Sequence, residues 1–583
     1  MKQQRVKLSE NSYKVLEDRY LYKEIGEGTW EDVAERVSKH ISMVEENEKR
    51  EKYFQEFYEV IAPMFFIPAG RILRNSGRPD GNLFNCFCLP IGDSIEEIGQ
   101  HYKDSLILWS NGGGVGTNFS PLRPKGDVIM GKGGKSSGLV SFIEGSDYIA
   151  KRIESGGSRR AAALALVDIS HPEVIDFMDS KLVHGKLSHF NISVVVNNEF
   201  LNCVEEGNDW NFKFKQKVYG SVNSKDLWNK IMNNMISCGE PGLLNWSNFI
   251  KNNSYYFAPV ISPNPCGEVP LSSYECCCLG SLVLPNFITG NVNTNWKKLE
   301  QVIKTSIRFL DNVIDASKYA LKENDINSHN GRRIGLGVLG LAEYLFSKKI
   351  RYGSQKAVYE VERLMRFIRD VSYQASNELA REKGAFPKFD NYLYSRASFV
   401  KKLPAQLRSD IKRYGQRNVT TMAHAPGGSI SLLTNFTSGI EPLFSKGYRR
   451  ADRIGDRIYI HDLYKNFILN NEEIPEWYVD TFDLKPEEHL EIQSATQKFT
   501  DGSVSKTINL PEETTSEDLS NVLLEYIRDI KGVTVYRDKS RGEQVLFPLE
   551  FEEIKNIIYD EKIETTEDLS EEDVSCANGS CEI

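Results

Sequence analysis

The sequence predicts an α/β protein that begins with a small helical region. Over residues 1–65, apolar residues recur at spacings of three and four, the period of an amphipathic helix. From 66 to about 545, short apolar runs alternate with helical stretches and with turns rich in Gly and Asn. Such alternation is typical of an α/β barrel or a layered α/β domain. Residues 549–583 are polar and acidic, and we expect them to form a flexible tail.

Each predicted part depends on particular residues. The expected strands of the α/β domain include the apolar runs 192–196, 282–284 and 334–341. We place this domain at residues 66–548. In the helical region the periodic positions are Leu8, Tyr13, Leu16 and Tyr20, then Trp30, Val33, Ala34, Val37 and Ile41.

The composition excludes several classes of protein. Hydrophobic residues make up 40% of the 583 and charged residues 26%, as in ordinary soluble enzymes. A net charge of −9 argues against a nucleic-acid polymer as partner, because phosphate backbones are bound by excess Lys and Arg. The sequence has no signal-peptide core and no apolar run of about 20 residues, the length of a membrane span. We expect a cytoplasmic protein without a membrane partner.

Ten cysteines stand at positions 86, 88, 203, 238, 266, 276, 277, 278, 576 and 581. They are too unevenly spread for the disulfide framework of a secreted protein. Structural zinc usually needs two ligand pairs spaced about two to four residues apart, which this pattern lacks, so we expect no metal site. Reactive thiols are the favoured interpretation. Two of them, Cys576 and Cys581, lie on the acidic tail, which favours a function for it over a merely solvated end.

Asn264-Pro-Cys266-Gly-Glu268 places an amide, a thiol and a carboxyl group at alternate positions. In an extended segment, alternate side chains point to the same side, so the three groups would face one substrate. Asn, Pro and Gly equally favour a turn over residues 263–267. The residue types alone leave both interpretations open.

Further cysteines lie at 276–278 and at 86 and 88. Taken singly, each is better explained as a buried small hydrophobe. Taken together with the Asn264 motif, the pattern resembles that of ribonucleotide reductases, over roughly residues 8–545 and the tail. The matching segments, in the order of the family, are 86–90, 191–193, 264–268, 277–281, 335–340, 425–431 and 438–442.

The resemblance implies a ten-stranded α/β barrel with a finger loop that carries the radical cysteine. Cys266 would be the thiyl radical that abstracts the ribose 3′-hydrogen, and Glu268 the general base on the 3′-hydroxyl. Asn264 would hydrogen-bond the sugar hydroxyls. Cys86 and Cys277 would deliver the reducing electrons and end as a disulfide.

The family's thiol shuttle resembles the tail pair Cys576 and Cys581, which would re-reduce that disulfide and be reduced in turn by a thioredoxin- or glutaredoxin-like protein. A tether of roughly 30 residues has a span of about 30 Å, enough for such a pair to reach the site and return. Each sulfur must make direct contact with the next for exchange to occur.

Residues that bind the substrate phosphates are also implied by the resemblance. They are Gly428, Ser429, Ile430 and Ser431, which precede an apolar helical run and so offer N–H groups to an anion. A plain Gly/Ser turn is the alternative. Family members often have Thr at the position of Gly427, so one hydroxyl contact is absent here.

Effector deoxynucleotides or ATP are expected to bind near Asp93 and the loops at 125–137 and 155–160, with Arg159 or Arg160 as a ligand. Exposed charges of this kind are otherwise simple solvated surface. The nucleotides would carry Mg²⁺.

The radical source is expected to be adenosylcobalamin, as in class II of the family. Where class I enzymes have adjacent tyrosines late in the barrel, this chain has Gly532-Val-Thr-Val-Tyr536. Its Tyr255-Tyr256 pair precedes Cys266 and is in a different place. The alternative is a class I catalytic subunit that needs a separate radical-generating subunit.

Residues 1–65 are too few for an ATP cone, and no segment resembles the insertion of the monomeric class II enzymes, so a homodimer is expected. A rival of another kind is a cysteine-rich metal-binding protein without activity. Two nucleotide-binding lookalikes are set aside. Gly335-x-Gly337-x-x-Gly340 has no clear strand before it, and Gly134-Lys-Ser lacks the first glycine of a P-loop.

Overall fold

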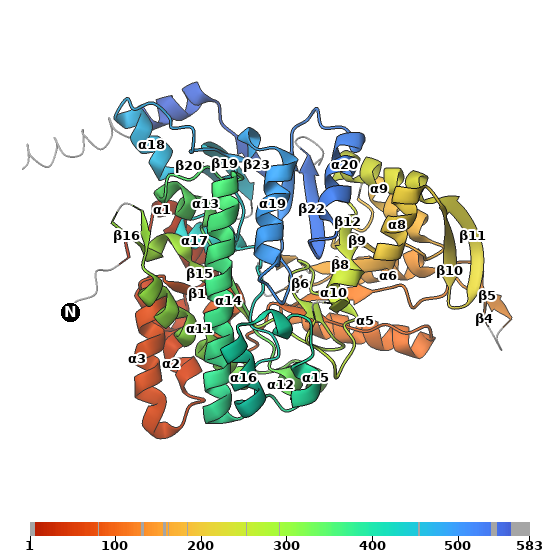
Figure 1. The fold of residues 1–583 in the computed structure, drawn as a ribbon, viewed down its shortest axis with the longest axis horizontal. Coiled ribbons are helices and arrows are strands. Elements are labelled where there is room, and N and C mark those ends of the chain that lie inside the picture. Colours follow the sequence, from red (N-terminus) through yellow and green to blue (C-terminus); the bar gives the residue numbers. More distant parts are fainter. Residues whose placement is uncertain are drawn as a thin grey trace, which may run out of the picture.

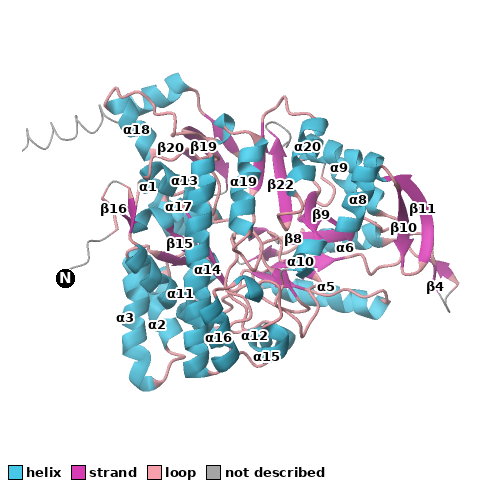
Figure 2. Ribbon diagram, in the orientation of Figure 1, coloured by secondary structure: helices cyan, strands magenta, loops and turns pink. Residues whose placement is uncertain are grey.

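The computed structural model describes residues 6–79, 81–129, 133–155, 159–160, 162–183, 185–251, 253–290, 292–452, 455–537 and 545–560. Side chains at 154, 155, 159 and 160 are outside this description. Two sheets lie inside the molecule, with helices around them (Figure 1, Figure 2). No helix of these residues is both long and apolar enough to cross a membrane.

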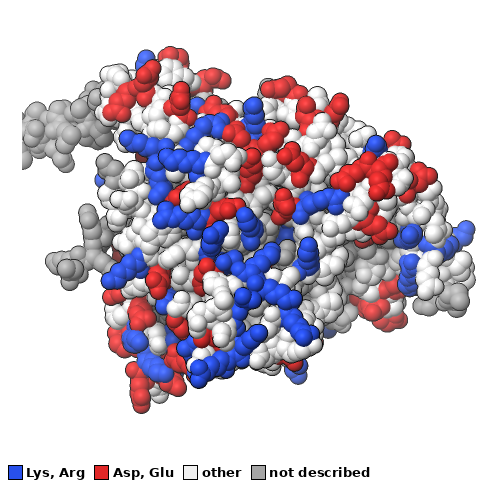
Figure 3. All heavy atoms as spheres, in the orientation of Figure 1, with Lys and Arg blue, Asp and Glu red and all other residues white. Residues whose placement is uncertain are grey.

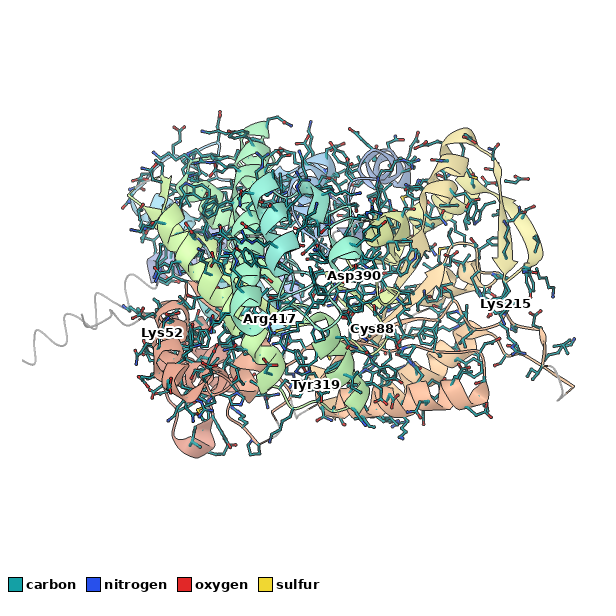
Figure 4. All side chains as sticks on the ribbon, turned by 60° about the horizontal axis from the view of Figure 1, so that its bottom comes forward. Lys52, Cys88, Lys215, Tyr319, Asp390 and Arg417 are labelled. Atoms are coloured by element: carbon teal, nitrogen blue, oxygen red, sulfur yellow. The ribbon has the colours of Figure 1, made fainter. Side chains whose placement is uncertain are left out.

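The N-terminal region is helical, as the sequence predicts. It consists of α1 (Glu10–Arg19), α2 (Trp30–Ser42) and α3 (Arg50–Ile61). The predicted stripe Trp30, Val33, Ala34, Val37 and Ile41 is buried on one face of α2. Helices α2 and α3 pack against α11 (Trp296–Ala316), at the end of the molecule where Lys52 lies (Figure 4).

The larger sheet has seven strands, five from the first half of the chain and two from near its end. Its order is β2-β3-β8-β9-β12-β22-β21. The first five strands are parallel, β22 is antiparallel to β12, and β21 is parallel to β22. Strands β8 and β9 are almost wholly buried, which explains their continuous apolar runs. The bounds are β2 Cys86–Cys88, β3 Gly114–Asn118, β8 Ala163–Asp168, β9 Phe190–Val196, β12 Gly242–Asn245, β21 Thr507–Leu510 and β22 Gly532–Arg537.

A second sheet has three strands in the order β1-β15-β18, namely Phe66–Pro68, Leu279–Val283 and Gly335–Leu339. Its last strand explains the dinucleotide-binding lookalike. A Cβ atom at Gly337 would lie 2.6 Å from the carbonyl oxygen of Ala423, so these glycines permit the close approach of a neighbouring segment. Gly335 and Gly337 therefore belong to a buried strand, which agrees with the prediction that this segment is not a dinucleotide-binding loop.

Single bridges connect the two sheets with each other and with the segment 422–424. They pair Phe87 with Cys276, Leu336 with Met422, and His424 with Val504. Within the described residues the strands do not form one closed sheet. The α/β architecture is confirmed, whereas the ten-stranded barrel and its finger loop stay predictions.

Long helices cover the sheets. Helix α14 (Gln355–Lys383) crosses the face seen in Figure 1 and packs on α11 and α19 (Pro486–Gln497). Helices α9 (Ser224–Cys238) and α20 (Ser516–Tyr526) pack on each other beside β22. The others are α4 Gly70–Asn75, α5 Ile95–Ser110, α6 Leu139–Ala150, α7 Val174–Asp179, α8 Asn198–Glu206, α10 Trp246–Lys251, α12 Lys322–Gly331, α13 Leu341–Ser347, α15 Asn391–Tyr394, α16 Ala405–Tyr414, α17 Gly428–Thr434 and α18 Asp462–Leu469.

Small sheets lie at the periphery. The hairpin of β10 (Asp209–Phe214) and β11 (Lys217–Asn223) lies at the opposite end from α3, where Figure 4 labels Lys215. Strand β19 (Gly447–Asp452) is central in the sheet β20-β19-β23. The remaining strands are β4 Val128–Ile129, β5 Gly134–Lys135, β6 Glu154–Ser155, β7 Arg159–Arg160, β13 Ser262–Pro263, β14 Pro270–Leu271, β16 Ile288–Thr289, β17 Asn293–Thr294, β20 Gly455–Ile460 and β23 Leu546–Pro548.

The chain beyond β23 differs from the prediction of a flexible tail from residue 549. Residues 551–560 are helical, and Ile554 and Ile558 on this helix are buried. Ile554 packs against Gly447 of β19. The predicted boundary at 549 is therefore too early, because twelve residues of the assigned tail belong to the folded part.

Charge is unevenly distributed on the surface. Asp and Glu gather over α8, α9 and α20, whereas Lys and Arg gather over the lower part of α14 and over α16 (Figure 3). The net charge of −9 is thus a sum over patches of opposite sign.

Candidate active site

The Asn264 motif forms the tip of a short hairpin between β13 and β14. The N–H group of Gly267 donates to the carbonyl oxygen of Asn264 at 2.9 Å, and that of Val269 donates to Asn264 Oδ1 at 2.9 Å. Gly267 has φ +81°, which a side chain would strain. Of the two interpretations left open by the sequence, the turn is correct, and the extended segment is wrong.

This turn separates the three predicted groups. Cys266 is exposed and lines a cavity of about 700 Å³, together with Pro265 and Gly267. Asn264 and Glu268 are buried and are not among the residues that line this cavity. The thiol thus faces the cavity, while the amide and carboxyl groups are enclosed by protein.

Burial gives Glu268 an unusual protonation equilibrium. Its side chain is 2% exposed, and this burial raises the pKa of the carboxyl group to about 7, although the nearby amide of Asn264 opposes the shift. Within the described part of the chain, Glu268 Oε2 and Asn264 Nδ2 have no hydrogen-bond partner of good geometry. A carboxyl group that titrates near neutral pH suits general acid–base catalysis.

The structure brings Cys86 and Cys277 together from distant parts of the sequence. Cys277 N donates to Cys86 O at 3.0 Å, next to the bridge between Phe87 and Cys276. Burial raises the pKa of the Cys277 thiol well above its usual value, and a hydrogen bond with Cys86 and the charge of Glu268 raise it further. The thiol pair therefore lies within electrostatic range of the carboxyl group.

Glycines in β3 bring the hairpin against the thiol pair. A Cβ atom at Gly116 would lie 2.0 Å from Pro263 O, and one at Gly114 would lie 3.1 Å from Pro265. Gly114 is the partner of Cys86 in the register of β2 and β3. The hairpin with Cys266 therefore crosses a bare part of β3, directly beside the strand that carries Cys86.

Three further cysteines are buried close by. Cys88, Cys276 and Cys278 are each at most 4% exposed, and burial raises the pKa of each thiol. Cys88 lies inside the molecule (Figure 4). Protonated, buried thiols are unreactive, so these three behave as small hydrophobic side chains in this state. No group of three or more possible ligand side chains in the described ranges is placed to hold a metal ion.

The predicted phosphate loop lies on the same cavity. Gly428 and Ser431, at the start of α17, line its wall. Ile430 N and Ser431 N both donate to Gly427 O, at 2.8 and 3.3 Å. These two N–H groups are used within the helix, which leaves the first residues of the turn as the better anion donors.

Ser429 is directed toward the N-terminal region. Its Oγ shares a hydrogen bond of 2.6 Å with the hydroxyl of Tyr20 at the end of α1. A Cβ atom at Gly70, the first residue of α4, would lie 3.4 Å from the same hydroxyl. The helical N-terminal region thus packs directly against the loop.

Asp93, a predicted effector residue, follows β2 in the chain. Asp93 accepts hydrogen bonds from Arg123, with Arg123 Nε 3.0 Å from Asp93 Oδ2, and Lys215 Nζ is 3.7 Å from the same oxygen. Arg159 and Arg160 form β7, but their side chains fall outside the described residues. Cys576 and Cys581 also fall outside them.

Sequence reasoning missed an ion pair in the cavity wall. Lys506 Nζ lies 2.7 Å from Glu441 Oε2 and 3.1 Å from His489 Nδ1, and its side chain is fully buried. Burial lowers the pKa of Lys506, while Glu441 opposes that shift. Glu441 belongs to the segment 438–442, which is one of those that resemble the reductase family. The sequence therefore marked this segment, but did not indicate a role for Glu441.

Comparison with known families agrees with this geometry. The family model described as "Ribonucleotide reductase, barrel domain" matches residues 84–536, and "Ribonucleotide reductase, all-alpha domain" matches residues 6–81. The chain belongs to the ribonucleotide reductase family. The reductase barrel match begins two residues before Cys86 and ends at Tyr536, so it includes the hairpin, the thiol pair and all of the cavity lining except Val545 and Leu546.

Named relatives of this reductase include two vitamin B12-dependent ribonucleoside-diphosphate reductases. That of Thermoplasma acidophilum is 34% identical over 85% of this chain and 66% of its own length. That of Mycobacterium tuberculosis strain CDC 1551 is 34% identical over 93% of this chain and 81% of its own length. The alpha subunit of the ribonucleoside-diphosphate reductase of Chlamydia pneumoniae is 26% identical over 87% of this chain and 57% of its length.

Proposed function

We propose that this protein reduces ribonucleotides to deoxyribonucleotides by a thiyl-radical mechanism that adenosylcobalamin initiates. The observation that carries the proposal is the arrangement around one hairpin. Cys266 faces the cavity, Glu268 is buried two residues further along the hairpin, and the Cys86–Cys277 pair lies within electrostatic range of Glu268. A hydrogen-atom acceptor, a base and a two-electron reductant are the groups that this reaction requires.

In the proposed reaction, the Cys266 thiyl radical takes the 3′-hydrogen of the ribose. Glu268 accepts the 3′-hydroxyl proton, and Asn264 orients the sugar hydroxyls. The 2′-hydroxyl leaves as water with a proton from the thiol pair. Cys86 and Cys277 supply two electrons and two protons in total and end as a disulfide, and Cys266 returns its hydrogen to the 3′-carbon.

The Glu268 pKa of about 7 fits this role, because a base near neutral pH can accept a proton and release it within one cycle. The thiols of Cys86 and Cys277, in contrast, must stay protonated until they react. The raised pKa of Cys277 keeps it protonated until the substrate radical needs a hydrogen donor.

Substrate phosphates, with Mg²⁺, are proposed to bind at Gly428, Ser429, Ile430 and Ser431. The cavity contact of Gly428 and Ser431 supports this placement. Effector deoxynucleotides or ATP are proposed to bind near Asp93, Arg159 and Arg160. Because Asp93 forms an ion pair with Arg123, an effector that contacts Asp93 would have to break this ion pair or bind beside it.

Cys576 and Cys581 are proposed to re-reduce the Cys86–Cys277 disulfide and to receive electrons from a thioredoxin- or glutaredoxin-like protein. The proposed assembly is a homodimer in the cytoplasm, and the proposed fold is the ten-stranded barrel with the hairpin 262–271 as its finger loop.

Adenosylcobalamin is proposed to bind against the aromatic part of the cavity that Cys266 also lines. Phe436, Tyr448, Tyr459 and His461 give this part broad aromatic surfaces with polar edges, which suit a large flat ligand. When bound, the cofactor supplies the radical that converts the Cys266 thiol to a thiyl. The names of the B12-dependent relatives support the same choice.

The adjacent tyrosines Tyr255 and Tyr256 are not placed for a radical relay to Cys266. Tyr255 donates a hydrogen bond to Glu275, and Tyr256 donates to Lys388 O at 2.6 Å. Both belong to an aromatic cluster separate from the main core, and neither lines the cavity. A tyrosine relay to Cys266 would need these rings at the cavity wall.

An anaerobic assay tests the proposal. Purified protein is incubated with a ribonucleoside diphosphate or triphosphate, a dithiol and adenosylcobalamin, and deoxynucleotide is quantified. Wild type should turn over, and Cys266→Ala should not. Cys203→Ala, on α8, is the matched control and should keep wild-type activity. Turnover only after addition of a second, metal-containing protein would support the class I alternative, and turnover by Cys266→Ala would refute the mechanism.

A further inference from the structure

A buried lysine, next in the chain to the cavity-lining residue Gly532, holds the loop 501–503, which contacts the hairpin. Lys531 is 1% exposed and immediately precedes β22. Its Nζ donates to two successive carbonyl oxygens, Asp501 O and Gly502 O, each at 2.7 Å. Burial lowers the pKa of Lys531 to about 7, and a buried amine is costly unless it is hydrogen-bonded, so these two hydrogen bonds fix the position of residues 501–502.

The carboxylate of Asp501 fixes the same loop from the opposite direction. It accepts hydrogen bonds from Thr421 N at 2.8 Å, Met422 N at 2.9 Å and Gly502 N at 2.8 Å. The hydroxyl of Tyr373, on α14, donates to Asp501 Oδ2 at 2.7 Å. Charge-assisted hydrogen bonds of this kind are stronger than neutral ones.

The loop 501–503 also forms a hydrogen bond to the hairpin. Ser503 N, the next amide in the chain, donates to Glu268 O at 2.7 Å. The loop also packs tightly against the hairpin: a Cβ atom at Gly502 would lie 2.4 Å from Met422 O and 3.2 Å from Glu268 O. The backbone of Glu268 is therefore held by a loop that Lys531 and Asp501 hold in turn.

We infer that Lys531 and Asp501 are positioning residues, which act through Ser503 to keep the Glu268 carboxyl group buried against the thiol pair. The inference deepens the proposed function, since it concerns the same base. Both act on Glu268 through the backbone of residues 501–503, by the hydrogen bonds of Lys531 to residues 501 and 502 and of Ser503 N to Glu268 O.

The inference has a specific consequence for Glu268. Its pKa is raised to about 7 by burial, and its neighbours are Asn264 and the thiol of Cys277. If the loop releases the hairpin, water reaches the carboxyl group and its pKa falls toward the ordinary value of 4.5. A residue with a purely structural role elsewhere would lower stability without moving this titration.

The titration can be measured without turnover. Difference infrared spectra of wild type minus Glu268→Gln isolate the carboxyl band, and its pH dependence gives the pKa. In Lys531→Met, this pKa should fall by at least one unit, on the order of a tenfold change in the proton equilibrium. Lys531→Arg, which keeps cationic donors, should recover part of the shift. An unchanged Glu268 titration in folded Lys531→Met would overturn the inference.

Turnover provides the second readout. In the assay described above, Lys531→Met should lower kcat on the order of 10- to 100-fold with little change in KM, because a misplaced base affects the chemical step. The acid limb of the kcat profile should move to lower pH. Inactive wild type with a Glu268 pKa that still depends on Lys531 would refute the proposed function and leave the positioning role intact.

Two matched controls separate positioning from folding. Lys383 also holds polar groups, Glu45 at 2.9 Å and Asn312 at 2.8 Å, but lies away from the hairpin, so Lys383→Met should leave the Glu268 titration unchanged. If Lys531→Met does not fold, Tyr373→Phe removes a single hydrogen bond to Asp501 and should shift the titration in the same direction by less. Tyr344→Phe, which removes a comparable bond to Glu360, is its control. Identical titrations in Tyr373→Phe and Tyr344→Phe would then overturn the inference.

Discussion

Cys86 and Cys277 lie next to each other across an antiparallel bridge, with Cys277 N donating to Cys86 O at 3.0 Å. Their thiols are in hydrogen-bond contact, and both strands are anchored in sheets that the rest of the fold builds. The pair can therefore form a disulfide with little movement of the backbone.

Mild oxidation of the folded protein should produce a Cys86–Cys277 disulfide before any other among the cysteines 86–278. Alkylation followed by peptide mass spectrometry identifies it. Cys277→Ser should abolish this product, whereas Cys276→Ser should not, because neighbouring side chains of an extended segment point to opposite sides. A disulfide that includes Cys88 or Cys276 in wild type would contradict the assignment.

Gly116→Ala should displace the hairpin. The added Cβ would lie 2.0 Å from Pro263 O, and such overpacking costs typically about 1–3 kcal/mol in the free energy of unfolding. The folded protein should also lose turnover, because Cys266 moves with the hairpin. Gly99→Ala on α5, where a Cβ meets open space, is the control and should stabilise by about 0.5–1 kcal/mol. Denaturant unfolding and the assay measure both effects, and full activity in Gly116→Ala would argue against the placement of the hairpin.

Glu268→Gln should change how stability depends on pH. The folded-state pKa of about 7 lies above the ordinary value of 4.5, so folding favours the protonated carboxyl group. Wild type and variant should differ by a constant amount below pH 4.5, and wild type should lose stability relative to the variant as the pH rises through 7. The total change is about 3 kcal/mol. Urea unfolding across this range measures it, and a pH-independent difference would show that the carboxyl group is not desolvated.

Ile558→Ala should destabilise the protein by about 2–5 kcal/mol, because it leaves a cavity where a fully buried side chain packs. Glu552→Ala, at an exposed position of the same helix, should stay within about 0.5 kcal/mol of wild type. Thermal unfolding compares the two. Equal stability of both variants would mean that residues 551–560 contribute nothing to the fold.

Local patterns predicted the parts of this protein that depend on local interactions. The spacing of Trp30, Val33 and Val37 predicted a helix with one buried face, and α2 has that face. The apolar run 192–196 predicted a strand, and it lies in β9. Helical and extended periods are properties of a short segment, so they can be recognised without knowing what packs against it.

Local patterns were less reliable where packing decides. The five residues 264–268 are compatible with an extended segment and with a turn, and the hydrogen bonds of the hairpin decided between them. The acidic composition after residue 548 predicted a tail, but Ile554 and Ile558 find a core to enter, so residues 551–560 fold. Composition does not tell whether a few apolar residues meet a partner surface.

By itself, the sequence determined which chemical groups this reductase has: the thiol of Cys266, the carboxyl group of Glu268 and a supply of further cysteines. The family resemblance of the sequence already named Cys86 and Cys277 as a pair, but the tertiary structure alone decided that Glu268 is desolvated and that Lys531 reaches the loop that contacts it. The physical reason is that burial and proximity between distant segments arise from the packing of whole sheets and helices, whereas chemical identity belongs to each residue separately.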